Sequence, residues 1–194
     1  MDVQLHNQTT DSVHQKKTLI DNTQENLEDL KKLIAINVKI TKLLLEGRIT
    51  ADEYDKIYGN YESRFKSAVQ LREILLKHFQ SEIKTHGTRL ASVYDDKEIL
   101  SARQQIGDIQ QNEYVIKMRA IDWEIQHLEE KINRLKDCLN ISHKLKDQLE
   151  LGDLNFIHNF ISQDFNSIKR AKLNDDVKSR LNTRIETMLE LVHS

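Results

Sequence analysis

Proline is absent from this chain of 194 residues, and glycine occurs only five times. Both residues commonly form the turns between β-strands, so their scarcity argues against a sheet-based fold. Aromatic residues make up 6% of the chain and hydrophobic residues 38%, while charged residues reach 31%. That balance is typical of long helices with a narrow apolar face. We therefore predict an all-α fold of long antiparallel helical hairpins with coiled-coil packing, elongated in shape.

Cysteine and long apolar runs are also scarce. The single cysteine, Cys138, cannot form a disulfide within the chain, and the N-terminal residues are polar rather than a basic and then apolar signal segment. Apolar runs such as Leu43 to Leu45 are far shorter than the ~20 residues that cross a bilayer. These features predict a cytoplasmic protein without an integral membrane segment, which reaches a membrane only through a partner.

No excess of one charge is present, since 29 Lys and Arg face 31 Asp and Glu, a formal net charge of −2. Nucleic acid is therefore not an expected partner of the chain as a whole. Residues 164–184 are locally basic, and we interpret them as a solvated helix face, with weak nucleic-acid binding as the alternative. The cluster contains the basic residues Lys169, Arg170, Lys172, Lys178, Arg180 and Arg184 and the acidic residues Asp164, Asp175 and Asp176.

The stretch "LLLEGRITADEYDKIYGNYE", residues 43–62, combines the signals that stop one helix and start another. Gly47 can adopt the left-handed conformation that closes a helix, and Thr50 with Glu53 forms a capping box. Ile49 precedes the cap, where its side chain can fold onto Tyr54. We predict a tight hairpin turn at 47–50 between two long helices of matching length.

A second copy of this motif, "QQIGDIQQNEYVIKMRAIDW", occupies residues 104–123. The residues kept at the same spacing are Gly107, Ile109, Glu113 and Tyr114. Gln110 replaces the capping threonine, and glutamine caps a helix poorly. Between a kink and a full turn at 107–110, we therefore favour a kink in a continuous helix.

These signals divide the chain into three parts. Residues 1–12 lack helical periodicity and are predicted to be a mobile polar tail. Residues 13–150 form the long-helix coiled-coil region, with a break at 85–92, where "THGTR" interrupts the apolar stripe. Residues 151–194 form two shorter helices after a turn at Gly152, the last one capped by Asn174.

The most regular apolar stripe lies between Tyr114 and Leu139, in a helix predicted to extend to about Glu150. Its members recur at alternating steps of four and three residues, which is typical of a coiled-coil seam. We predict that this seam binds a second copy of the chain or another helical protein. The seam residues are Met118, Ile121, Ile125, Leu128, Ile132, Leu135 and Leu139.

Residues with catalytic or metal-binding chemistry are scattered along the sequence. His78 and His86 are interpreted as structural or solvent-facing, and Cys138 as a helix-flank residue, because no zinc-ligand or nucleophile pattern includes them. Four aromatic residues at helical spacing are interpreted as packing residues rather than as base-stackers: Tyr54, Tyr58, Tyr61 and Phe65. We expect no catalytic, cofactor-binding or metal-binding residues, and hence no enzyme.

Two segments carry a family resemblance: "LLEGRITADEYDKIYGNYESRF" and "ARQQIGDIQQNEYVIKMRAIDWEIQHLEEKI". Through these segments, the region 25–140 resembles the coiled-coil domain of the CdvA-like family of archaeal cell-division proteins. The second turn is similar to that family's through Ala102, Arg103, Ile106, Gly107, Asp108, Ile109, Glu113 and Tyr114. The resemblance implies a filament- or scaffold-forming protein that works with ESCRT-III-like division proteins at the membrane and in some members with DNA.

Two functions are consistent with these features. The first is a non-enzymatic coiled-coil structural or scaffold protein, similar to the CdvA-like coiled coil of archaeal cell division, that acts by self-association or partner binding. The alternative is a monomeric helical adaptor or regulator without a division role, whose last two helices open for a partner.

Overall fold

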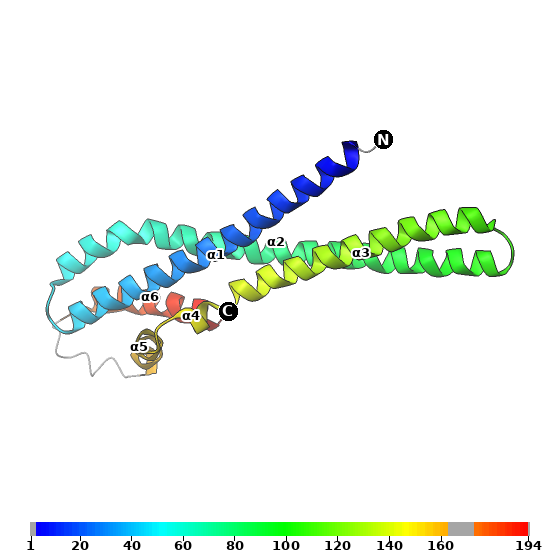
Figure 1. Ribbon diagram of the computed structural model, residues 1–194. Coiled ribbons are helices and arrows are strands. Elements are labelled where there is room, and N and C mark those ends of the chain that lie inside the picture. The colour runs from blue at the N-terminus through cyan, green and yellow to red at the C-terminus, as the bar shows by residue number, and fades with distance from the viewer. Residues whose placement is uncertain (1–2, 163–172, 194) are drawn as a thin grey trace. The chain divides into compact units, whose positions relative to one another are not determined.

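The computed structural model describes residues 3–162 and 173–193, and the side chains of 20–160 and 173–193. All regular secondary structure in these ranges is helical, so the all-α prediction is confirmed. The helices are α1 (Val3–Leu45), α2 (Ala51–Gln105), α3 (Gln111–Ser142), α4 (Leu145–Gln148), α5 (Leu151–Ser162) and α6 (Asp175–His193) (Figure 1). The chain divides into two compact units, one of Met1–Ile74 with Ile141–Ser194 and one of Leu75–Asn140.

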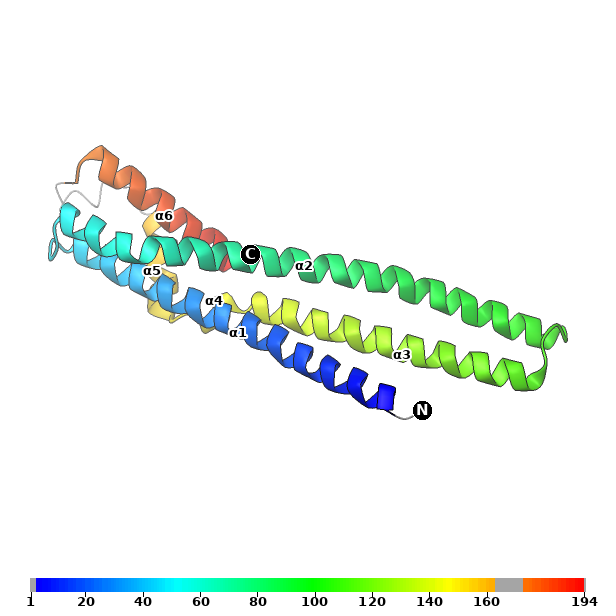
Figure 2. The ribbon, with the colours of Figure 1, turned by 90° about the horizontal axis from the view of Figure 1, so that it is seen from above.

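The first unit is a helical bundle around one apolar core. Within it, α1 lies beside the first part of α2, α6 lies along α2, and α5, seen nearly end-on in Figure 1, crosses them (Figures 1 and 2). All of these helices and the short α4 contribute to the core. Its most completely buried side chains include Leu30, Ile34, Val38, Tyr54, Leu145, Ile157, Leu181 and Ile185.

Polar side chains interrupt the buried face of α1, and the backbone satisfies their amide and hydroxyl donors. Asn26 Nδ2 donates to the Ala68 carbonyl of α2 at 2.9 Å. Within α1, the Asn37 amide donates to the Leu33 carbonyl and the Thr41 hydroxyl to the Asn37 carbonyl, each at 2.8 Å. Because a buried donor without a partner is costly, these bonds allow polar residues at core positions.

The second unit consists of the last part of α2 and most of α3, which lie side by side (Figure 2). Its apolar core joins Val93 of α2 to Ile125 and Leu128 of α3, with Leu90 and Ile121 packed against them. Polar bonds at the edges also join the two helices. They are Arg89 Nε to Glu124 Oε1 at 2.8 Å, Tyr94 OH to Glu129 Oε1 at 2.8 Å, and Lys97 Nζ to Asp122 Oδ1 at 2.7 Å.

Two predictions of non-helical structure are wrong. The predicted tail over 1–12 is helical in its described part, since α1 begins at Val3. Residues 3–12 contain neither glycine nor proline, so no residue there stops the helix. The predicted break at 85–92 is absent, because α2 continues through Gly87. A glycine in a helix costs at most about 1 kcal/mol, and the packing of Leu90 and Val93 against α3 offsets that cost.

The predicted kink at 107–110 is a full break between helices. The α2 helix ends at Gln105, α3 begins at Gln111, and Gly107 has a left-handed φ of 77°. The threonine cap is not required for this break. With Gly107 left-handed, the Gly107 and Asp108 amides donate to the Gln104 and Arg103 carbonyls and so close the preceding helix.

The predictions for residues 139–152 also need correction. The α3 helix ends at Ser142 instead of near Glu150, and Gly152 lies in the first turn of α5 instead of forming a turn. The break falls earlier, at Leu149, whose backbone is extended. The end of α3 is stabilised from a distant position, because the buried Arg72 guanidinium donates to the Ser142 carbonyl from Nε at 3.3 Å and Nη2 at 3.1 Å.

Candidate functional site

The first glycine motif forms a tightly bonded turn between α1 and α2. Gly47 has a φ of 69°, and the Arg48 amide donates to the Leu43 carbonyl at 2.9 Å, which closes α1. The Thr50 amide then donates to Glu53 Oε2 at 2.8 Å, and the Glu53 amide donates to Thr50 Oγ1 at 3.3 Å. These reciprocal bonds are the predicted capping box. The bonds from Thr50 lower the pKa of the Glu53 carboxyl below its ordinary value.

Apolar residues of this first motif pack into the core of the first unit. Tyr54 is 2% exposed and belongs to that core, and Ile49 packs against it while partly buried. Tyr58 and Phe65 are also buried. The motif therefore anchors the α1–α2 turn to the bundle through the buried rings of Tyr54 and Tyr58, while Tyr61 is half-buried against the same core.

The second motif closes α2 in the same way but begins α3 differently. The Asp108 amide donates to the Arg103 carbonyl at 2.9 Å, matching the bond from Arg48 in the first motif. Arg103 Nε also donates to Asp108 Oδ2 at 2.6 Å. Glu113 forms an ion pair with Lys117 at 2.7 Å, one turn further along α3. Ile109 is buried and Tyr114 is half-buried, so this copy also covers its turn with apolar side chains.

Basic residues of the predicted 164–184 cluster are paired with acids where the structure describes them. Arg180 Nη2 lies 2.9 Å from Asp55 Oδ2, and Arg180 also pairs with Asp176. Lys178 pairs with Asp175 at 3.0 Å. The residues Asp164, Lys169, Arg170 and Lys172 lie outside the described residues. The basic residues in the described part of the cluster are therefore paired within the chain.

The guanidinium group of Arg184 stacks on two tyrosines of α2. Its Cζ lies 3.4 Å from the Tyr58 ring centroid and 5.2 Å from that of Tyr54, and the two rings are stacked 6.0 Å apart. Arg184 Nη1 is 3.6 Å from Asp55 Oδ1. Burial raises the pKa of Tyr58 above its ordinary value, although Arg184 acts in the opposite direction. These contacts join α2 to α6 and hold the Arg180 and Arg184 side chains against α2.

The predicted seam of α3 is covered by the chain itself. Ile125, Leu128, Ile132 and Leu135 are between 6% and 8% exposed, and Met118, Ile121 and Leu139 are half-buried. Ile121, Ile125 and Leu128 pack on Leu90 and Val93 of α2. The surface predicted to bind a partner is therefore occupied in part by a second segment of the same chain.

The prediction that Cys138 lies on the flank of α3 is wrong. Its side chain is 1% exposed, whereas its neighbour Leu139 is half-buried. Buried positions continue from Leu135 through Cys138 to Ser142, so the covered face of α3 shifts by one residue. Cysteine can occupy such a position because it behaves as a small apolar side chain.

The histidines of α2 fit the structural interpretation. The His78 ring lies 6.0 Å from the Phe79 ring, centroid to centroid. His86 is 15% exposed, and its Nε2 lies 3.2 Å from Glu82 Oε2 one turn earlier. Side chains of the described residues form no group of three or more His, Cys, Asp or Glu that could hold a metal ion. No described helix has the length and apolarity that a membrane span requires.

Large apolar side chains are exposed on the second unit, on faces for which the sequence predicted no binding role. Ile99 of α2 is 59% exposed and Ile106, in the turn just after α2, is 79% exposed, while Ile116 and Trp123 of α3 are 69% and 62% exposed. Within α3 the two residues are seven positions apart, the repeat of a coiled-coil face. That spacing in the sequence could have indicated a second apolar stripe. The regular seam on the other face of α3 concealed it.

No protein-family model, no curated protein and no solved structure matches the chain at a significant level. The resemblance to the CdvA-like family therefore stays a prediction that rests on the residues of the two glycine motifs.

Proposed function

We propose that this protein is a non-enzymatic helical scaffold that acts by helix–helix association. The observation that carries the proposal is the group of large exposed apolar side chains on the second unit: Ile99, Ile106, Ile116 and Trp123. Single exposed apolar side chains are common on protein surfaces, but several large ones on one small unit mark an interaction site. Because the predicted seam is covered in part within the chain, we propose these exposed side chains as the surface that binds a partner.

We further propose that α2 and α3 pack as an antiparallel coiled coil within the second unit. The covered positions of α2 recur at steps of three and four residues through Leu90, Val93, Lys97 and Leu100. Arg89 and Glu124 each precede a core position, and Tyr94 and Glu129 each follow one. Flanking residues that pair in this equivalent way favour the antiparallel orientation. A hairpin of this kind is a rigid platform on which outer side chains are held in fixed register.

The resemblance to the CdvA-like family adds one class of partner to this proposal. A scaffold of archaeal cell division would bind ESCRT-III-like division proteins and reach the membrane through them. Co-sedimentation of the full chain with such a protein, with and without vesicles, would test this part of the proposal. If the chain bound neither the ESCRT-III-like protein nor the vesicles, the division role would be refuted. Helix–helix association would still be tested separately.

Sedimentation velocity from micromolar to sub-millimolar concentrations tests the proposed association directly. We expect the average mass to rise with concentration, and to rise less when Ile99, Ile106, Ile116 and Trp123 are all replaced by glutamine. A mass that stays at 22.8 kDa throughout would contradict self-association. In that case, binding of a different helical protein would favour the alternative of a monomeric adaptor.

A further inference from the structure

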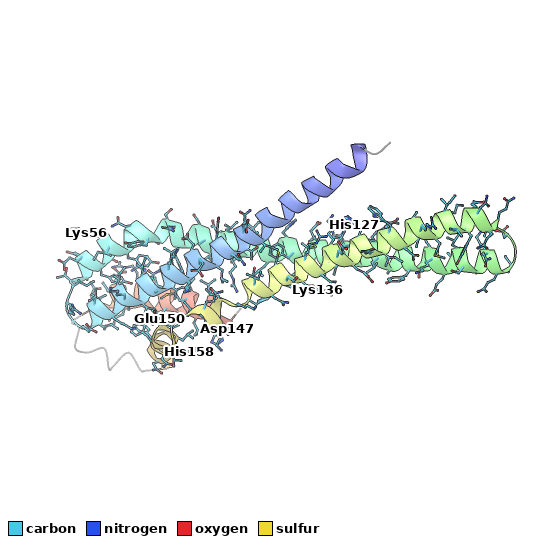
Figure 3. The ribbon with its side chains drawn as sticks, viewed as in Figure 1. Lys56, His127, Lys136, Asp147, Glu150 and His158 are labelled. Carbon is cyan, nitrogen blue, oxygen red and sulfur yellow. The ribbon has the colours of Figure 1, made fainter. Side chains whose placement is uncertain are left out.

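The outer face of α3 carries a short stripe of four residues: Ile116, Ala120, Trp123 and His127, the last labelled in Figure 3. They recur at steps of four, three and four residues, so they share one face of the helix. All four are exposed. At about 100° per residue, this stripe lies opposite the covered seam through Ile121, Ile125 and Leu128.

The centre of the stripe is a flat aromatic surface. The Trp123 and His127 rings are stacked 5.3 Å apart, with only 3° between their planes. Trp123 nevertheless remains 62% exposed. An exposed indole beside a small residue, Ala120, offers both a protrusion and a hollow. Such a pair is self-complementary, because the protrusion of one copy can enter the hollow of another.

We propose that a second copy of the chain packs its own stripe against this one, with the two α3 helices antiparallel. In that register Trp123 lies over Ala120 of the second copy, and Ile116 lies against His127 of the second copy. Each contact occurs twice because the interface is two-fold symmetric. A large side chain opposite a small one lets the helices approach closely without a void.

The charges beside the stripe favour the same register. Lys117 follows Ile116 in the sequence, Glu124 follows Trp123, and antiparallel packing places Lys117 near Glu124 of the second copy. Both are partly exposed, with side chains 49% and 35% accessible, and each also has a partner within its own chain, Glu113 for Lys117 and Arg89 for Glu124. A parallel arrangement in register would bring each stripe residue toward its own equivalent, so that Trp123 would meet Trp123 instead of the small Ala120.

The stripe ends at Glu113 and Glu130, which the antiparallel register places opposite each other. Each already has a cation within its own chain, since Glu113 pairs with Lys117 and Glu130 pairs with Arg134 at 3.1 Å. Like charges that face each other still oppose a longer interface. The contact is therefore limited to four side chains from each copy, and we expect a weak and reversible dimer rather than an obligate one.

This inference rests on the proposed function and names the partner and the surface. Trp123 is the only tryptophan in the chain, so its fluorescence reports on this surface alone. We expect the emission of a solvated indole at low concentration and a blue shift that follows the rise in mass by sedimentation. Ala120→Glu should place a carboxylate in the hollow, weaken the dimer about tenfold or more, and abolish the shift.

The matched control is Ala91→Glu, the same change at an exposed position of α2 away from the stripe. It should leave both the mass and the emission as in the parent chain, and far-UV circular dichroism should show equal helix content in all variants. Lys117→Glu should weaken the dimer by like-charge repulsion. The triple variant Lys117→Glu with Glu124→Lys and Arg89→Glu should restore it, because opposite charges again face each other across the two-fold axis and the pair between positions 89 and 124 is kept within the chain.

Three results would overturn the inference. A rise in mass without a shift in Trp123 emission would show association through another surface and would leave the proposed function standing. An equal effect of Ala120→Glu and Ala91→Glu would likewise overturn this surface. A monomer at every concentration, with an unchanged solvated emission, would overturn both the dimer and the self-association in the proposed function.

Discussion

Replacing Gly47 and Gly59 by alanine should change stability in opposite directions, although both residues belong to the first unit. Gly47 has a φ of 69°, whereas Gly59 lies inside α2 with helical neighbours on both sides. Neither position has an atom within 4 Å of an added Cβ. Steric crowding by neighbours is therefore excluded at both sites, and only the backbone conformation distinguishes them.

The expected magnitudes follow from that difference. A left-handed alanine costs roughly 1–2 kcal/mol. Replacing glycine by alanine also lowers the conformational entropy of the unfolded chain, which offsets about 0.4–1 kcal/mol of that cost. Gly47→Ala should therefore lower the free energy of unfolding by on the order of 1 kcal/mol. Gly59→Ala should raise it by about 0.5–1 kcal/mol, the usual difference between glycine and alanine in a helix.

Urea denaturation followed by far-UV circular dichroism measures both changes on the same unit. Gly47→Asn serves as the control, because asparagine adopts the left-handed conformation more readily than alanine and should lose less stability. An equal stabilisation by Gly47→Ala and Gly59→Ala would refute the argument. It would show that the turn does not depend on a left-handed residue.

Three further predictions concern caps, a buried arginine and pH. Thr50→Ala should cost about 1 kcal/mol by removing the capping box, and Gln110→Thr should gain about 0.5 kcal/mol or more at the start of α3, both measured by urea denaturation. Arg72→Met should destabilise the first unit by roughly 2 kcal/mol, because it leaves the buried Ser142 carbonyl without its charged donor. The raised pKa of Tyr58 contributes stability that is fully present below the unfolded-state pKa of about 10.0 and lost as pH rises through the higher folded-state pKa. Tyr58→Phe should flatten this alkaline decline in thermal melts.

Each of these predictions can fail in a distinct way. Equal stability of Thr50→Ala and the parent chain would mean that water replaces the cap without loss. A neutral Arg72→Met would mean that the cost of burying the guanidinium equals the value of its bonds. For Tyr58→Phe, an alkaline decline as steep as in the parent chain would assign that decline to other groups.

Local features of the fold could be predicted from the sequence because local interactions decide them. Gly47 ends α1 in the left-handed conformation, Thr50 and Glu53 cap α2, and the Asn174 side chain accepts a bond from the Val177 amide at 2.9 Å. Each of these depends on a few consecutive residues and on backbone geometry that the rest of the chain need not supply.

Where packing between distant residues decides whether a helix continues or stops, the local sequence does not predict the outcome. The α2 helix continues through Gly87 because Leu90 and Val93 find partners on α3. The α3 helix stops at Ser142, whose carbonyl accepts bonds from Arg72, seventy positions earlier in the chain. Contacts between residues so far apart in sequence are decided by packing, which outweighs helix propensity.

The candidate interaction site shows the same division. The sequence by itself determined an all-α chain with a regular apolar seam on α3, because apolar residues recur there at steps of three and four positions. Only the tertiary structure decided that α2 covers part of this seam and that Trp123 on the opposite face is left exposed. Two apolar stripes on one helix are equivalent in sequence, and the neighbour that packs against one of them determines which remains free.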